Sequence, residues 1–159
     1  MGESSIQSVR IPKKWRNLAE TRCKEMGARL TPARLTAYSE LIASNQPLSA
    51  YELVARLEKL KQKKIAPLTA YRHLDFLISV GLVHKLESAQ SYVPCVQPGH
   101  EHPSQYLMCS TCDVVVEVES EEFGNLIEQM ANQHGFQPAN AIVEVNGLCK
   151  KCLKKGASC

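Results

Sequence analysis

The chain has 159 residues, 44% of them hydrophobic and 22% charged, with a formal net charge of +3. This composition excludes a wholly disordered chain and suits one compact domain or two small ones. No apolar run approaches the length that crosses a bilayer, and the polar first 17 residues lack the apolar core of a secretion signal, so we expect a cytoplasmic protein without a membrane partner.

The charge is divided unevenly along the chain. Residues 1–85 hold 15 Lys and Arg against 7 Asp and Glu, whereas residues 86–159 hold 4 against 9. A basic first half is typical of a unit that binds a polyanion, although basic side chains also serve simply to solvate helix faces. The asymmetry predicts two units with different partners.

Three helices are predicted in the first half. The first begins after Thr31, a capping residue that is followed by proline at the first helical position. The second follows a capping box, in which Ser49 and Glu52 each satisfy a backbone N–H of the other. The third spans Pro67–Val80 and ends before a glycine. Its expected apolar face consists of Ala70, Leu74, Leu77 and Ile78.

Two short alternating segments follow the third helix. "LVHKLE" and "SYVPC" flank the polar loop Ser88–Gln90, which predicts a β-hairpin. Three helices and a hairpin together predict a winged helix-turn-helix, in which the third helix enters the major groove of DNA. A helical bundle that uses the same apolar pattern is the alternative.

The outward face of the third helix carries candidate DNA contacts. Arg72 is the candidate base reader, because a guanidinium can bridge guanine O6 and N7, and Thr69 shares its face. Tyr51 and Tyr71 are candidates for contacts with the DNA backbone or thymine methyl groups, although Tyr71 also fits the edge of the core. Phosphate contacts are expected from Lys13, Lys14, Lys61, Lys63 and Lys64. The "KLKQKK" segment equally suits a solvated helix face.

The second half carries two C-x-x-C pairs, Cys109 with Cys112 and Cys149 with Cys152. Four thiolates are the set that favours a closed, tetrahedral structural zinc site. The long spacing between the pairs predicts a small subdomain: a strand in "DVVVEVE", a helix over Glu121–His134 and a strand in "AIVEVNGLC". A zinc ion would staple a unit that is too small to be secure alone. Reduced free thiols or a redox dithiol are the alternatives.

A second group of candidate ligands lies around the junction of the two halves. The hairpin brings His84 and Cys95 to one end of the first unit, while His102 precedes the first C-x-x-C pair and Glu117 follows it. These four side chains could hold a metal ion that fixes the relative orientation of the units. Ordinary hydrogen bonds to the histidines and a solvent-facing Glu117 are the alternative, and His100 could replace His102.

Several segments together resemble the ferric uptake regulator family, most of all its zinc uptake regulator branch. They are "RLTPAR", "SAYEL", "TAYRHLDFLISVGLVHKLES", "SYVPC", the two C-x-x-C pairs and "GLCKKC". The resemblance covers about residues 15–152 in the family's order. It implies an α/β (α+β) protein with a winged-helix DNA-binding domain over residues 1–95, a hinge over 96–103, and an α/β dimerisation domain over 104–159 that a structural zinc staples.

The resemblance also assigns roles to particular residues. It implies a structural zinc on Cys109, Cys112, Cys149 and Cys152. It implies a regulatory zinc on His84, Cys95, His102 and Glu117, so that two zinc ions per chain are expected. It implies DNA contacts by Tyr51 and Arg72. The expected protein is a bacterial homodimeric repressor, not an enzyme, which takes no small-molecule substrate and binds an AT-rich palindromic operator when the regulatory zinc is bound.

Some positions depart from the family's patterns. Where iron-sensing members crowd histidines and an aspartate before the first C-x-x-C pair, this chain has Pro103, Ser104, Gln105 and Tyr106. This departure argues against an iron-type site. Two rival functions remain open: an iron-responsive or peroxide-responsive regulator of the same family, the latter with Cys23, Cys95 or Cys159 as its reactive thiol, and a zinc enzyme.

Overall fold

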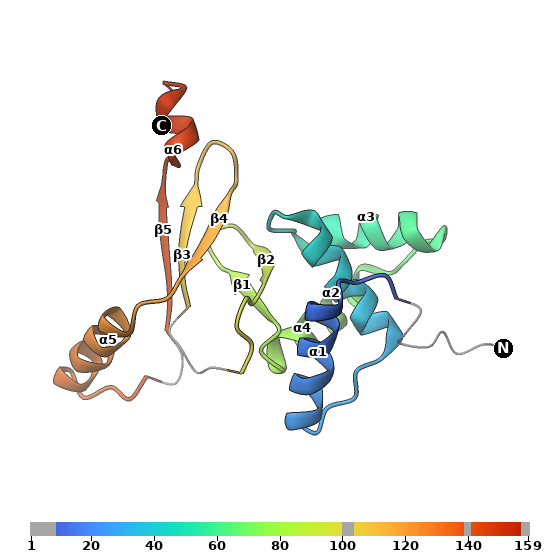
Figure 1. The fold of residues 1–159 in the computed structure, drawn as a ribbon, viewed down its shortest axis with the longest axis horizontal. Coiled ribbons are helices and arrows are strands. Elements are labelled where there is room, and N and C mark those ends of the chain that lie inside the picture. The colour runs from blue at the N-terminus through green and yellow to red at the C-terminus, as the bar shows by residue number, and fades with distance from the viewer. Residues whose placement is uncertain (1–8, 100–103, 139–140, 157–159) are drawn as a thin grey trace. The chain divides into compact units, whose positions relative to one another are not determined.

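The computed structural model describes residues 9–99, 104–138 and 141–156, and the chain divides into two compact units, Met1–Gly99 and His100–Cys159. The described elements of the first unit are α1 (Lys13–Glu25), α2 (Pro32–Ser44), α3 (Ala50–Lys61), α4 (Pro67–Ser79), β1 (Val83–Leu86) and β2 (Ser91–Pro94). Those of the second are β3 (Ser104–Cys109), β4 (Val115–Val118), α5 (Glu121–Gln133), β5 (Ile142–Gly147) and α6 (Lys150–Lys154) (Figure 1). The predicted fold class, a winged-helix unit followed by a small mixed helix–sheet unit, is confirmed.

The helix starts in the first unit follow the capping signals. The Thr31 side chain accepts a hydrogen bond from the Arg34 N–H at 3.3 Å. The Ser49 hydroxyl accepts from the Glu52 N–H at 3.2 Å, and the Ser49 N–H donates to the Glu52 carboxylate at 2.7 Å. Each bond satisfies a backbone N–H that has no partner within the helix. The predicted capping box is therefore confirmed.

One apolar core holds the first unit together. Leu35, Leu53, Leu74 and Leu77 come from α2, α3 and α4, and each is fully buried. The hairpin joins this core through a backbone bridge, in which the N–H groups of Leu48 and Tyr92 donate to each other's carbonyls at 3.1 and 2.8 Å. The wing is thus fixed to the chain segment that leads into α3.

The structure corrects three expectations for the first unit. The helix α1 was not predicted, and among its residues only Ala19 and Cys23 are buried. The third predicted helix, now α4, has Ala70, Leu74 and Leu77 on its buried side, but Ile78 is 37% exposed. The β2 strand ends at Pro94, so Cys95 lies one residue beyond the wing strand.

A three-stranded sheet organises the second unit, in the order β4–β3–β5 (Figure 1). The central strand β3 pairs antiparallel with β4 and parallel with β5. The predicted strands and the helix are confirmed as β4, α5 and β5, with the α5 cap supplied by Ser120. Neither β3 nor α6 was predicted. None of the helices in the described part of the chain has the length and apolar character to span a bilayer.

Candidate metal centre and nucleic-acid interface

The register of β3 against β5 brings the two C-x-x-C pairs together. Cys109 is the last residue of β3 and lies opposite Gly147, the last residue of β5. Because the strands are parallel, their carboxyl ends meet at one edge of the sheet. Cys112 follows in the turn after β3, while Cys149 caps the short helix α6 that contains Cys152. Two cysteine pairs with 36 residues between them in the chain therefore converge.

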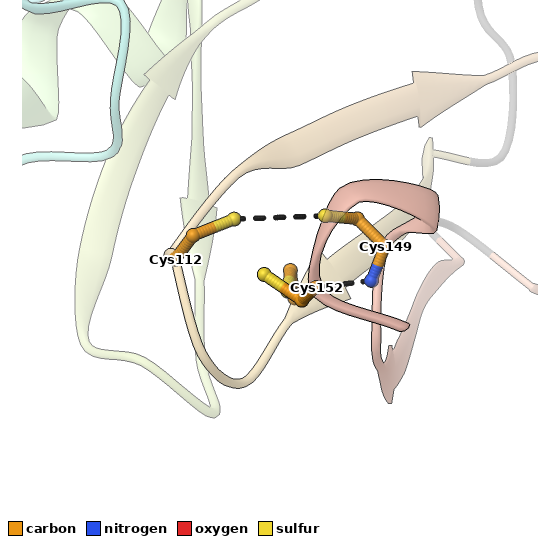
Figure 2. Close-up of side chains that lie close together, drawn as sticks. Cys112, Cys149 and Cys152 are labelled. Atoms are coloured by element: carbon orange, nitrogen blue, oxygen red, sulfur yellow. Dashed lines mark hydrogen bonds between the residues drawn. The ribbon is translucent and has the colours of Figure 1, made fainter. Parts of the chain in front are cut away.

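The four cysteine sulfurs lie within 4.8 Å of one another. The Sγ atoms of Cys112 and Cys149 are 3.7 Å apart, and Figure 2 shows these two side chains pointing toward each other, with Cys152 close by. Thiolates around one tetrahedral zinc at a Zn–S length of about 2.3 Å lie about 3.8 Å apart. Cys109 and Cys152 are buried, whereas Cys112 is exposed. The donor set and its spacing fit a closed zinc site.

Backbone N–H groups prepare two of these sulfurs for a cation. The N–H groups of Cys149, Thr111 and Cys112 hold the pKa of the Cys109 thiol at about 6, well below its usual 9.0, and the first of these bonds is 3.3 Å long. The Cys152 N–H lowers the pKa of the Cys149 thiol. Burial raises the pKa of Cys152 to about 12. The fold therefore favours the thiolate form of Cys109 and Cys149 even without a metal, and a bound cation would deprotonate the remaining thiols.

The second predicted ligand group is distributed over both units. In the first unit, a ring nitrogen of His84 on β1 and the Sγ of Cys95 lie within 4.8 Å of each other. The Cys95 N–H donates to the Leu82 carbonyl at 2.9 Å, which fixes the backbone that carries the thiol. In the second unit, Glu117 on β4 is half-buried and accepts a hydrogen bond from its cross-strand neighbour Tyr106 at 3.4 Å. His102, like His100, lies outside the described residues.

The predicted DNA-contacting residues lie on exposed surface. Arg72 and Thr69 are exposed on the outer side of α4, and Tyr71 is 38% exposed rather than part of the core. Tyr51, in the first turn of α3, is 69% exposed. The Lys64 side chain is 96% exposed, and its Nζ lies 3.4 Å from a carboxylate oxygen of Glu58. These side chains are available to a partner.

Glu58 also has a role that the sequence did not indicate. Its carboxylate accepts a hydrogen bond from the Ile65 N–H at 2.9 Å, and this bond lowers the pKa of Glu58. The bond fixes the loop between α3 and α4, which leads into the helix that carries Arg72. The two partners are seven residues apart across a non-helical loop, so no periodic pattern could reveal the pair.

Comparisons with known proteins agree on one family. The model of the ferric uptake regulator family matches residues 25–146. The zinc uptake regulation protein of Escherichia coli (strain K12) is 35% identical over 139 residues, which cover 86% of this chain and 80% of that protein. A solved structure described as a zinc uptake regulator complexed with zinc and DNA matches with a TM-score of 0.84 and 32% identity, covering 92% of this chain and all of that one.

A relative with a different signal also matches. The peroxide operon regulator of Bacillus subtilis (strain 168) is 28% identical over 135 residues, which cover 83% of this chain and 89% of that protein. Its identity is lower than that of the zinc uptake regulation protein. Members of this family therefore respond to different signals, and the metal-binding residues of this chain distinguish between them.

Proposed function

The chain belongs to the ferric uptake regulator family, and from that premise we propose that it is a zinc-responsive transcriptional repressor. It would bind operator DNA as a homodimer and control genes of zinc uptake and homeostasis. Such a repressor acts on DNA in the bacterial cytoplasm. The observation that carries the proposal is the pairing of a four-thiolate centre with a winged helix-turn-helix whose polar face is exposed.

The structural part of the proposal assigns one zinc ion to the four cysteines. Zinc there would crosslink the turn after β3 to the start of α6. It would thereby hold the carboxyl ends of β3 and β5 together. A unit of about 60 residues gains much of its stability from such a crosslink. Dimerisation through this unit is therefore expected to depend on Cys109, Cys112, Cys149 and Cys152.

The regulatory part assigns a second zinc ion to His84, Cys95, His102 and Glu117. A thiolate and imidazoles favour zinc over harder cations, which prefer carboxylate and water. The first two ligands already lie together in the first unit, and the other two belong to the residues that follow. Ligation across the proposed hinge, residues 96–103, would restrict the orientation of the DNA-binding unit.

Specific DNA binding is proposed to follow from that restriction. A symmetric dimer presents two α4 helices, and these must be about one helical turn of DNA apart to meet both half-sites of a palindrome. Arg72 would read bases, while Thr69, Tyr51 and Tyr71 would contact bases or backbone, and Lys64 phosphates. By linkage, DNA must tighten zinc binding by the same factor by which zinc tightens DNA binding.

The test is a fluorescence anisotropy titration of a labelled AT-rich palindrome in zinc-buffered solution. The wild-type protein is expected to bind only above a threshold of free zinc. Cys95→Ser should lose this zinc dependence yet remain a dimer by size-exclusion chromatography. Cys23→Ala, which alters another buried thiol of the same unit, is the matched control and should respond like the wild type. Binding that ignores zinc would contradict the proposal.

The peroxide and iron alternatives are tested in the same experiment. Reactive thiols are exposed and have a lowered pKa, whereas Cys23 is buried and its burial raises its pKa. Cys95 is 2% exposed. Cys159, the third candidate thiol, lies outside the described residues. The burial of the other two favours the zinc signal over a peroxide signal that uses Cys23 or Cys95. DNA binding that responds to ferrous iron or to peroxide, with no zinc threshold, would instead support one of these alternatives.

A further inference from the structure

One arginine of the first unit joins three segments that are distant in the sequence. The Nε atom of Arg22, on α1, donates to the carbonyl of Val80 at 2.9 Å, across 58 residues. The Nη1 atom of Arg22 also lies 3.4 Å from a carboxylate oxygen of Glu25, one turn further along α1. The Arg22 side chain is 24% exposed. It is thus held from both sides rather than free in solvent.

The bond to Val80 lies at the end of the proposed DNA-reading helix. Val80 is the C-cap residue of α4. Its carbonyl is one of the terminal carbonyls that have no N–H partner within the helix. A cation at this end also interacts favourably with the helix dipole. Arg22 therefore caps α4 from a different helix, and it fixes the end of α4 relative to α1.

The same guanidinium lies against the turn where the first unit ends. A Cβ atom built on Gly99, whose φ is +100°, would lie 3.6 Å from the Arg22 Nη1 atom. One built on Gly81, directly after α4, would lie 3.8 Å from its Nε and Nη2 atoms. These are ordinary van der Waals spacings, so the guanidinium lies next to both glycines. Arg22 is therefore bonded to the end of α4 and lies next to the turn that follows Cys95.

The segment between these contacts is short and fixed. Cys95 is bonded through its N–H to the carbonyl of Leu82, just beyond Gly81, and only three residues lie between Cys95 and Gly99. A displacement of this turn can pass to α4 through this backbone bond or through side chains that lie next to both. Within the described residues, Arg22 is a polar side chain bonded to the end of α4 and next to the turn.

We propose that Arg22 is a positioning residue that couples the turn at Pro98–Gly99 to the end of α4, so that metal binding at the regulatory site is transmitted to the DNA-reading helix. This inference rests on the proposed function. Arg22 touches neither metal nor DNA in this role. When it is removed, movement of the turn is absorbed locally, and the difference between zinc-loaded and zinc-poor DNA affinity becomes smaller.

The experiment measures a ratio of affinities. Operator affinity is determined for the wild type, Arg22→Gln and Arg22→Lys at low and at saturating buffered free zinc, in low salt so that both values are measurable. Arg56→Gln is the matched control, because Arg56 also makes an ion pair between helices of this unit, with Glu40 at 3.5 Å. Thermal unfolding of each variant is recorded in parallel.

Arg22→Gln is expected to reduce the zinc-induced affinity ratio about ten-fold, within the usual range of allosteric coupling. Arg22→Lys should reduce it as well, since one ammonium group cannot span the helix end and the turn as a planar guanidinium does. Arg56→Gln should keep the wild-type ratio. If Arg22→Gln does not fold at the assay temperature, Arg22→Lys decides.

The opposing outcomes are distinct. If a folded Arg22 variant keeps the wild-type zinc-induced affinity ratio, the inference is wrong and the proposed function stands. The same holds if the variant loses affinity equally at both zinc levels, because a purely structural role of Arg22 predicts that result. Absence of zinc dependence in the wild type overturns the proposed function together with the inference.

Discussion

Substitution of Arg72 by alanine tests whether α4 reads DNA sequence. The side chain is exposed on the outer side of the helix, while Leu74 and Leu77 on the inner side are fully buried. Truncation of an exposed side chain on such a face should change the free energy of unfolding by less than about 0.5 kcal/mol. The effect of Arg72→Ala should therefore appear in DNA recognition and not in stability.

The expected magnitude follows from the chemistry of the guanidinium. A bidentate contact with guanine contributes about 1–3 kcal/mol of discrimination against the wrong base, which corresponds to about a five- to 150-fold ratio of affinities. Arg72→Ala should lose this preference at one base pair of each half-site. At the other positions of the operator, the ratio of affinities should remain that of the wild type.

The assay is competition anisotropy at saturating zinc and fixed salt, with operators in which each G·C pair is replaced in turn. Lys64→Ala is the control, because the Lys64 side chain is 96% exposed and is proposed to contact phosphate. It should weaken binding to all sequences alike and reduce the salt dependence by about one phosphate contact. If Arg72→Ala behaves in that same uniform way, or if it unfolds the first unit, base reading by Arg72 is wrong.

Two further predictions concern stability and metal content. Ser49→Ala should lower the free energy of unfolding of the first unit by about 1 kcal/mol, measured by the fluorescence of Trp15, the single tryptophan of the chain. Because the Ser49 hydroxyl and N–H lower the pKa of Glu52 from 4.5, the stability they provide is present above that pH and is lost as pH falls through the lowered pKa. The difference between Ser49→Ala and wild type should therefore shrink as pH falls below 4.5, and a difference that stays constant with pH would contradict this account. Cys109→Ser should contain one zinc fewer per chain, as measured by elemental analysis, and should no longer dimerise, as measured by size-exclusion chromatography. The control Cys23→Ala should keep both its zinc content and its dimer. A dimeric, fully zinc-loaded Cys109→Ser would refute the structural role of the site.

The elements with strong local signals were predictable from the sequence. Thr31 and Ser49 carry capping side chains, and the helices after them begin where those side chains predict. Helix α1 has no such signal, because its N-cap is Pro12, which makes no side-chain cap hydrogen bond. Strand β3 was missed although both strands that pair with it, β4 and β5, were predicted. Elements that depend on their neighbours rather than on their own residues were therefore missed.

The residue types of the metal sites came from the sequence, but their arrangement needed the tertiary structure. The two C-x-x-C pairs predicted a four-thiolate site, because this spacing has few other uses in a reduced compartment. Only the parallel register of β3 with β5 explains how Cys109 and Cys149 meet and why the Cys149 N–H lowers the pKa of the Cys109 thiol. That hydrogen bond joins residues 40 positions apart, and no local pattern contains it.

The same distinction applies to the helix that is proposed to read DNA. Its amphipathic pattern alone separated the buried side, Leu74 and Leu77, from the outward Arg72, because helical period links residue spacing to direction. What fixes the helix at its two ends is the bond from Ile65 to Glu58 and the bond from Arg22 to Val80. Both depend on how the chain packs around the core, since hydrogen bonds between distant segments form only where folding brings a donor to an otherwise unpaired acceptor.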